Sequence, residues 1–392
     1  MLFSLSLILI IGFTLSGIFN RIKLPGILGM LITGIILGPF VLDLISPDIL
    51  NISSDLREIA LIVILARAGL SLDIKDLKKV GRPAILMCFI PATSELIAIL
   101  LFAPIFFNIS YLEAAIMGAV LAAVSPAVVV PRMLKVMESG YGKDKSVPQL
   151  ILAGASVDDI YVIVLFTAFI GMYQGKGFSA FSLATVPISI IVGLLTGIIS
   201  GNLLVWIFRK LHIRDTIKIL IVISTAFLFV TLETAIKPYV PMSGLLAVMA
   251  LGGTILKQYE ILAERLASKF SKIWVGAEIL LFVLVGASVD IRYATGAGLK
   301  AIILIAVALI FRVCGVYVSL LKTKLTKQEK LFCSISYLPK ATVQAAIGSI
   351  PISTGVRAGN IILTVAVLAI LITAPIGAIG IDLTYKRFLT KT

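Results

Sequence analysis

The sequence predicts an all-α membrane protein of thirteen transmembrane helices, arranged as an inverted-topology repeat of six plus six spans. The first observation is composition: of 392 residues, 59% are apolar and only 14% are charged, and apolar stretches long enough to cross a bilayer occur throughout. The second is that basic residues gather in alternate connections between these stretches. The third is that motifs of the first half recur about 215 residues later.

The apolar stretches are continuous runs, which favours helices over the alternating strands of a membrane barrel. The first stretch lacks a basic leader region, so we interpret it as a retained span and not as a signal peptide. The expected spans lie near residues 1–19, 24–42, 57–72, 83–107, 111–131, 147–173, 183–208, 217–236, 239–256, 273–290, 296–321, 331–352 and 358–384.

The basic residues indicate how the chain is oriented. Of the 34 lysines and arginines, 25 fall in odd-numbered connections and the C-terminal tail, and six fall in even-numbered connections. By the positive-inside rule the N-terminus lies outside and the C-terminus is cytoplasmic, as in a multi-pass plasma-membrane protein. The net charge of +14 is explained by these cytoplasmic loops. We therefore expect membrane lipids as partners, and no nucleic acid.

Three pairs of motifs relate the two halves of the chain. The pairs are Pro25 with Pro241, Gly69 with Gly286, and Ser125-Pro126 with Leu338-Pro339. The matched spans are seven apart, an odd number, so equivalent helices cross the membrane in opposite directions. The seventh span then connects two inverted six-span halves, which is typical of secondary transporters.

Pro126 and Pro339 fall inside the fifth and twelfth expected spans. Proline removes a backbone donor and disfavours helix in the preceding residue, so we expect two crossed, discontinuous helices. Unwound backbone at this depth is tolerated where it lines a polar site, and the exposed helix ends carry partial charges that hold ions. An ion channel is a weaker alternative, because a channel does not need this symmetry.

Asp158 and Asp159 lie about eleven residues into the sixth span, where each carboxylate costs roughly 2.5–3.5 kcal/mol. Adjacent acids at this depth suit a site at which a proton competes with a small hard cation. Ser125 and backbone carbonyls at the break are candidate further ligands, and Ser156 is a candidate supporting residue. The alternative is a static salt-bridge network.

Other charges also lie within the expected spans. Glu95 and Arg312 lie mid-span in the fourth and eleventh helices, 217 residues apart, and we predict a buried ion pair between them. The alternative is that they take part directly in binding the ion. Lys340 follows Pro339 directly; it either counters the aspartates or complements a half-helix end. Arg67 has no obvious partner.

At these residues the chain resembles a known family. The strings GAVLAAVSPAVVVPRM (118–133), ASVDDIYVIVLF (155–166) and YLPKATVQAAIGS (337–349) are similar to monovalent cation/proton antiporters, nearest to the NHA-type sodium/proton antiporters. The resemblance covers nearly the whole chain. It implies the NhaA-like antiporter fold and a homodimer with a dimerisation part (about 1–72 and 217–290), a core (about 83–173 and 296–384) and a linker helix (about 183–208).

The resemblance also implies a function, which is sodium or lithium exchange for protons by an elevator-like motion. Asp158 and Asp159 carry over as ion ligands, with Ser125 beside the break. Electrogenic relatives have a lysine at the position that we align with Arg312, and this difference favours electroneutral exchange. Within the class, potassium/proton exchange is the alternative, although potassium systems often have a Gln-Asp pair.

Outside the class, a sodium-coupled organic-anion symporter shares the crossed-helix logic but does not need two adjacent acids. An intramembrane aspartyl protease needs two aspartates from separate helices, which this pair is not. No phosphate-binding loop or metal-spaced His/Cys cluster occurs in the sequence. We therefore predict a transporter and not an enzyme, without a cofactor or a soluble protein partner.

Overall fold

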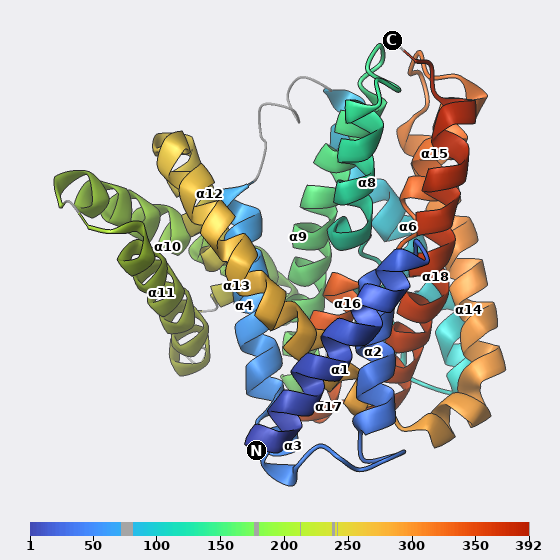
Figure 1. The fold of residues 1–392 in the computed structure, drawn as a ribbon, viewed down its shortest axis with the longest axis horizontal. Helices are drawn as coiled ribbons and strands as arrows, with labels where there is room; N and C mark the ends of the chain where they lie inside the picture. Colours follow the sequence, from blue (N-terminus) through green and yellow to red (C-terminus); the bar gives the residue numbers. More distant parts are fainter. Residues whose placement is uncertain (72–80, 176–179, 212, 237–239, 241, 392) are drawn as a thin grey trace. The chain divides into compact units, whose positions relative to one another are not determined.

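A computed structural model describes residues 1–71, 81–175, 180–211, 213–236, 240 and 242–391 (Figure 1). Within these ranges the regular secondary structure is helical, and a single β-bridge joins Tyr141 to Lys391. Pro241 of the sequence repeat lies outside the described residues, as does the side chain of Ser156.

The helices follow the expected spans closely. In chain order they are α1 (Leu2–Arg21), α2 (Gly26–Leu37), α3 (Pro47–Asn51), α4 (Ser53–Leu70), α6 (Arg82–Phe107), α7 (Tyr111–Leu121), α8 (Pro126–Glu138), α9 (Val147–Gln174), α10 (Ala180–Lys210), α11 (Asp215–Ile236), α12 (Gly244–Gln258), α13 (Glu260–Ala287), α14 (Ile291–Ser319), α15 (Lys327–Ser336), α16 (Thr342–Ile347), α17 (Ile350–Ser353) and α18 (Gly359–Phe388).

Nine helical stretches in the described part of the chain are long and apolar enough to cross a membrane, and α2 and α12 are shorter apolar helices. Every expected span contains a helix or an interrupted helix. The sequence did not predict the short helix α3. It also placed the start of α13 at residue 273, whereas the helix begins at Glu260, because its first turns are charged and do not register as apolar. The count of thirteen stays a prediction.

The chain forms two compact units. Unit 1 comprises Met1–Ser54, Asp73–Ile170 and Leu281–Thr392, and unit 2 comprises Asp55–Leu72 and Gly171–Leu280. In unit 1, α6 packs along α14, and α18 packs against α14 and α15. In unit 2, α10 packs along α12. All candidate site residues from the sequence lie in unit 1.

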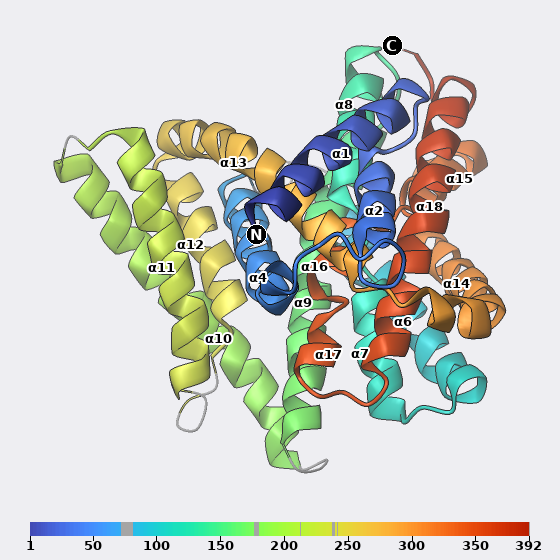
Figure 2. The ribbon, with the colours of Figure 1, turned by 60° about the horizontal axis from the view of Figure 1, so that its bottom comes forward.

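Two helices of unit 1 are interrupted at the predicted prolines. The first gives α7 and α8, with residues 122–125 between them, and the second gives α15 and α16, with residues 337–341 between them. Figure 2 shows that the two interrupted helices run in opposite directions, one from α7 to α8 and the other from α15 through α16 to α17. Proline suits the first turn of α8, since the amide that it lacks has no intrahelical partner there.

Both interrupted helices begin with the same capping device. Ser110 and Glu113 form a reciprocal capping box at the start of α7, and Thr326 and Glu329 form one at the start of α15. Both glutamates are buried and have a second role. Glu113 accepts a hydrogen bond from the backbone N–H of Ala358 (3.0 Å), which precedes α18. Glu329 forms a 2.9 Å ion pair with Lys145, just before α9.

Glycines allow α2 and α13 to pack backbone to backbone in unit 1. A Cβ atom added to Gly34 would lie 1.9 Å from the carbonyl oxygen of Val283, and one added to Gly286 would lie 2.2 Å from that of Leu31. Small residues at such crossings let membrane helices approach closely. The recurrence of Gly286 in the sequence motif therefore has a packing reason.

This contact predicts the effect of adding one methyl group. Gly34→Ala forces two backbones apart, so we expect it to destabilise the protein by about 1–3 kcal/mol, measured as a lower thermal-unfolding midpoint in detergent. Gly276→Ala, on the partner helix α13, is the matched control, because a Cβ atom there meets no atom within 4 Å. Equal midpoints for the two variants would contradict the proposed crossing.

Candidate functional site

The candidate site lies where the two interruptions cross. The backbone N–H of Ser125 donates a 2.8 Å hydrogen bond to the carbonyl oxygen of Pro339, which joins the first break directly to the second. The Ser125 hydroxyl lies 3.5 Å from the hydroxyl of Thr342, at the start of α16. Both Ser125 and Thr342 are buried. The two prolines identified in the sequence therefore mark two segments that are in contact.

Gln344 is a second link across the crossing, and the sequence analysis did not single it out. Its Nε2 donates to the carbonyl oxygen of Leu121 (3.2 Å), the last residue of α7, and to that of Ala123 (3.0 Å) in the first break. Its Oε1 accepts from the backbone N–H of Ala341 in the second break (2.8 Å). The side chain is fully buried, and both ends of its amide satisfy backbone groups that the unwound segments leave free.

Arg312 of α14 reaches both interruptions and two carboxylates. Its Nε donates to the carbonyl oxygen of Tyr337 (2.6 Å), and its Nη1 donates to that of Ala122. The same Nη1 lies 2.7 Å from Oε2 of Glu95 on α6. Its Nη2 lies 3.0 Å from Oδ2 of Asp158 on α9. Arg312 therefore contacts Glu95, as the sequence predicted, and also Asp158, which the sequence did not indicate.

Lys340, in the second break, also points to Glu95. Its Nζ lies 2.8 Å from Glu95 Oε2 and 3.4 Å from the carbonyl oxygen of Ala123. Its backbone N–H donates to the hydroxyl of Thr373 on α18 (3.0 Å). The sequence left two roles open for Lys340, countering the aspartates or complementing a half-helix end. In the structure its ammonium group contacts Glu95, which is not one of the aspartates, and a carbonyl oxygen in the first break.

Asp158 and Asp159 have different surroundings. Asp158 is fully buried, and its Oδ2 accepts from the backbone N–H of Val124 (2.8 Å) as well as from Arg312. Oδ1 of Asp158 and Oδ1 of Asp159 are buried, and neither has a hydrogen-bond partner among the described residues. Buried polar atoms normally have partners, so these two oxygens are open acceptors at the crossing.

The charges of the five ionisable side chains described above, hereafter the charged cluster, do not cancel. Arg312 and Lys340 are cations, and Glu95, Asp158 and Asp159 are acids, so the fully ionised cluster carries one net negative charge. Glu95 contacts both cations, and Asp158 contacts one. Asp159 is left without a contacting cation among the described ion pairs. A single proton or monovalent cation would neutralise the cluster.

Two further residues escaped the sequence analysis. Tyr337 is fully buried, and a Cβ atom on Gly154, one turn before Asp158, would lie 1.9 Å from its hydroxyl oxygen. Gly154, which precedes the aspartates in the sequence, was the feature that could have indicated this close contact. In unit 2, the opposite charges of Arg67 on α4 and Glu278 on α13 interact, so Glu278 is a candidate partner for Arg67.

Comparison with known proteins places the chain in a family. The family model described as "Sodium/hydrogen exchanger, transmembrane" matches residues 5–387. The chain belongs to this sodium/hydrogen exchanger family. The exchanger is 34% identical to mouse sodium/hydrogen exchanger 9B2, over 94% of the present chain and 69% of the relative. It is 31% identical to human sodium/hydrogen exchanger 9B1, over 94% of the present chain and 73% of the relative.

A solved structure shows that the exchanger shares its fold with a protein of low sequence identity. The sodium proton antiporter MjNhaP1 from Methanocaldococcus jannaschii matches with a TM-score of 0.84 at 21% identity, covering 98% of the present chain and 97% of that chain. The match confirms the predicted antiporter fold class. Together with the family and the apolar helices, it identifies the exchanger as a multi-pass membrane protein.

Arg312 gives the clearest test of the site's architecture. Arg312→Gln removes the cation that contacts Asp158 and frees two buried carbonyls, so we expect a loss of roughly 3–5 kcal/mol, seen as a lower thermal-unfolding midpoint. Arg312→Lys keeps the charge but not the planar fork, and an intermediate loss is expected. Arg387→Gln, at an exposed basic residue on α18, is the control. A wild-type midpoint for Arg312→Lys would show that the fork is unnecessary.

Proposed function

We propose that this exchanger is a secondary antiporter that exchanges Na⁺ or Li⁺ for protons by alternating access, and that cation and proton compete for Asp158 and Asp159. The observation that carries the proposal is the pair of open carboxylate oxygens beside the crossed interruptions. Membership of the sodium/hydrogen exchanger family supports the exchange reaction. The fold shared with a sodium proton antiporter supports it as well.

The surroundings of the two acids support a division of roles. Oxygen atoms are the usual ligands of small hard cations. Asp158 is held by Val124 and Arg312, whereas Asp159 has no contacting cation among the described ion pairs. We therefore infer that Asp159 is the principal ligand and proton carrier, with Asp158, water and the hydroxyl of Ser125 as further ligands.

Alternating access rests on the proposed inverted repeat of six plus six spans. The capping boxes give it support beyond the sequence motifs, since Ser110 and Glu113 precede Thr326 and Glu329 by 216 residues each. The opposite directions of the two interrupted helices agree with inversion (Figure 2). Thirteen spans, an outside N-terminus, a cytoplasmic C-terminus and the plasma membrane remain part of the proposal, as do the homodimer and its dimerisation, core and linker parts.

The charge balance favours exchange of one cation for one proton. Arg312, which contacts Asp158, does not release its proton in proteins. Lys340 contacts Glu95, which is also held by Arg312. This leaves one net negative charge for the cargo. We therefore propose electroneutral 1:1 exchange.

Replacing the carboxylates tests the site. Asp159→Asn cannot bind a proton and loses the proposed cation ligand, so we expect cation-dependent proton efflux from reconstituted vesicles to fall to that of protein-free vesicles. Na⁺, Li⁺ and K⁺ are each added, which also separates sodium from potassium exchange. Asp48→Asn, at an exposed aspartate of α3, should leave the flux unchanged. Full flux in Asp159→Asn would refute the site, and flux that requires an added organic anion would indicate a symporter instead.

The stoichiometry is tested with the wild-type exchanger. For 1:1 exchange, net flux stops when the sodium and proton concentration ratios across the vesicle membrane are equal. A membrane potential, imposed with K⁺ and an ionophore, should not move this reversal point. A reversal point that shifts with voltage, as two protons per cation require, would contradict electroneutrality and leave the site itself untouched.

A further inference from the structure

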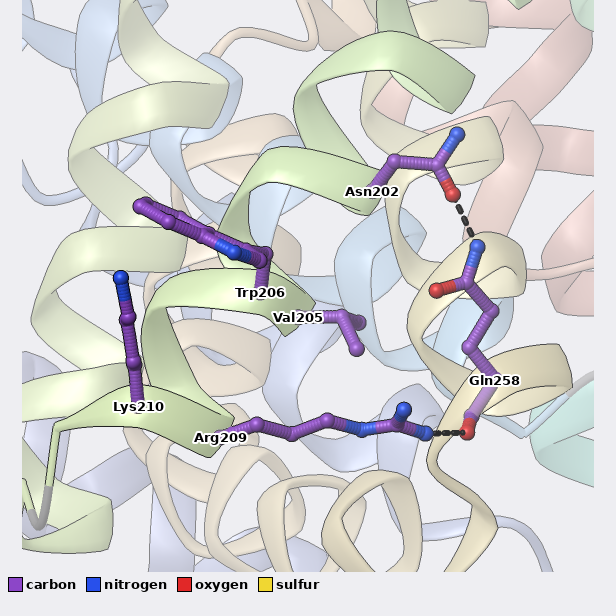
Figure 3. Close-up of a pocket in the computed structure, with 6 residues that line it drawn as sticks. All are labelled: Asn202, Val205, Trp206, Arg209, Lys210 and Gln258. Carbon is purple, nitrogen blue, oxygen red and sulfur yellow. Dashed lines mark hydrogen bonds between the residues drawn. The ribbon is translucent and has the colours of Figure 1, made fainter.

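Buried polar atoms without a partner are concentrated at the crossing of the interrupted helices. In the described part of the chain, six buried side-chain nitrogen or oxygen atoms form no hydrogen bond, and three of these are Oδ1 of Asp158, Oδ1 of Asp159 and the hydroxyl oxygen of Tyr337. Other polar side chains satisfy one another, as in a cavity of about 340 Å³ in unit 2, where Gln258 Nε2 donates to Asn202 Oδ1 (Figure 3). A buried hydroxyl without a partner is unfavourable, so that of Tyr337 needs a physical reason.

Tyr337 lies in the second break, and its ring reaches α9 one turn before Asp158. A Cβ atom added to Gly154 would overlap the hydroxyl oxygen of Tyr337, so the glycine provides the space that the hydroxyl occupies. Tyr337 and Asp158 are both fully buried. Residues four apart lie on one face of a helix, and helical side chains lean toward its N-terminal end. The carboxylate of Asp158 therefore leans toward the turn at which the hydroxyl lies.

The surroundings of the hydroxyl leave Asp158 as its acceptor. The titratable or charged groups that interact with the hydroxyl come from four helices: Asp158 of α9, Cys88 of α6, Arg312 of α14 and Cys333 of α15. From α8 and α18, the buried cluster that contains Tyr337 includes Val129, Met133, Ile381 and Tyr385. Of the four interacting groups, Asp158 is the one carboxylate, and an ionised carboxylate only accepts hydrogen bonds.

The charges on Asp158 leave one of its oxygens for this role. The groups that act on its carboxylate are Arg312, Lys340 and the neighbouring Asp159. Arg312 Nη2 and the backbone N–H of Val124 both donate to Oδ2. Oδ1 receives no hydrogen bond from the described residues. The carboxylate thus has an open acceptor, and the hydroxyl of Tyr337 is an open donor beside it.

We propose that Tyr337 is a positioning residue of the exchange site, whose hydroxyl donates through one bound water to Oδ1 of Asp158 and so favours the ionised carboxylate. Buried waters bridge polar groups that otherwise lack partners. A hydrogen bond to the charged form of a carboxyl group favours that form. Tyr337 thereby disfavours the proton in its competition with the cation. The inference rests on the proposed competition at Asp158 and Asp159.

Removal of the hydroxyl tests this role. Tyr337→Phe keeps the ring and the backbone carbonyl that Arg312 contacts. The proton then competes better, so we expect KM for Na⁺ in the vesicle assay to rise about threefold to tenfold at acidic pH and less than about twofold at alkaline pH. The pH of half-maximal flux should rise by about 0.5–1 unit, with little change in kcat. Tyr385→Phe removes a hydroxyl from the same buried cluster and is the control, with both values unchanged.

The pH dependence distinguishes this role from others. An equal rise in KM at every pH would make the hydroxyl oxygen a cation ligand, and an unchanged pH profile would show that the hydroxyl does not act on Asp158; either result overturns the inference. A wild-type exchanger in which Na⁺ and protons do not compete would refute the proposed function instead. Binding is measured without transport as the rise in thermal-unfolding midpoint on adding Na⁺, which should weaken in Tyr337→Phe at acidic pH only.

Gly154 provides a second test through the same contact. Gly154→Ala places a methyl group where the hydroxyl lies, so it should displace the ring and reproduce the upward pH shift. Combined with Tyr337→Phe, the methyl group no longer meets a hydroxyl, and the unfolding midpoint should exceed that of Gly154→Ala alone. Because both changes break one interaction, the pH shift of the double variant should be no larger than that of a single variant. Additive pH shifts would contradict the inference.

Discussion

The guanidinium of Arg312 contacts four separate segments, and the crossing of the interrupted helices depends on those contacts. Unwound backbone inside a bilayer has no water to satisfy it, and each free carbonyl costs several kcal/mol. Arg312 contacts one carbonyl in each break, Ala122 and Tyr337, and pairs with Glu95 and Asp158. A planar fork with five donors can do this from one side chain, and a lysine cannot. The guanidinium of Arg312 therefore stabilises the crossing and also sets the charge balance around Asp158.

This sharing separates structural charge from exchangeable charge. Glu95 is held between Arg312 and Lys340, and one oxygen of Asp158 is fixed by Arg312 and a backbone N–H. These contacts would remain while the cargo changes. Oδ1 of Asp158 and Oδ1 of Asp159 take part in none of these contacts. Both cations thus satisfy acids and carbonyls of the crossing, and we propose that the third acid, Asp159, carries the charge that a proton or a cation neutralises.

The features that could be predicted from the sequence are residues that are unfavourable inside a bilayer. Prolines and charges in apolar spans are costly, so the breaks at Pro126 and Pro339 and the pairing of Glu95 with Arg312 were visible without a structure. Contacts between side chains and backbone carbonyls were not, because they depend on packing between spans far apart in the chain. The role of Gln344 and the different partners of Asp158 and Asp159 are of this kind. The charge interaction between Arg67 and Glu278 is of the same kind, because the two residues lie on spans far apart in the chain.

The second half of the proposed repeat shows that a break in a helix can be satisfied by an uncharged side chain. In the first half, Asp158 of α9 accepts the N–H of Val124 in the first break; in the second half, Thr373 of α18 accepts the N–H of Lys340 in the second. The two acceptors are 215 residues apart and do the same structural work, and the position after Thr373 is the buried Ala374. A neutral hydroxyl therefore suffices to satisfy a break. The carboxylate at Asp158 and the second acid beside it exceed what the backbone needs, which supports the proposal that they bind the transported ion.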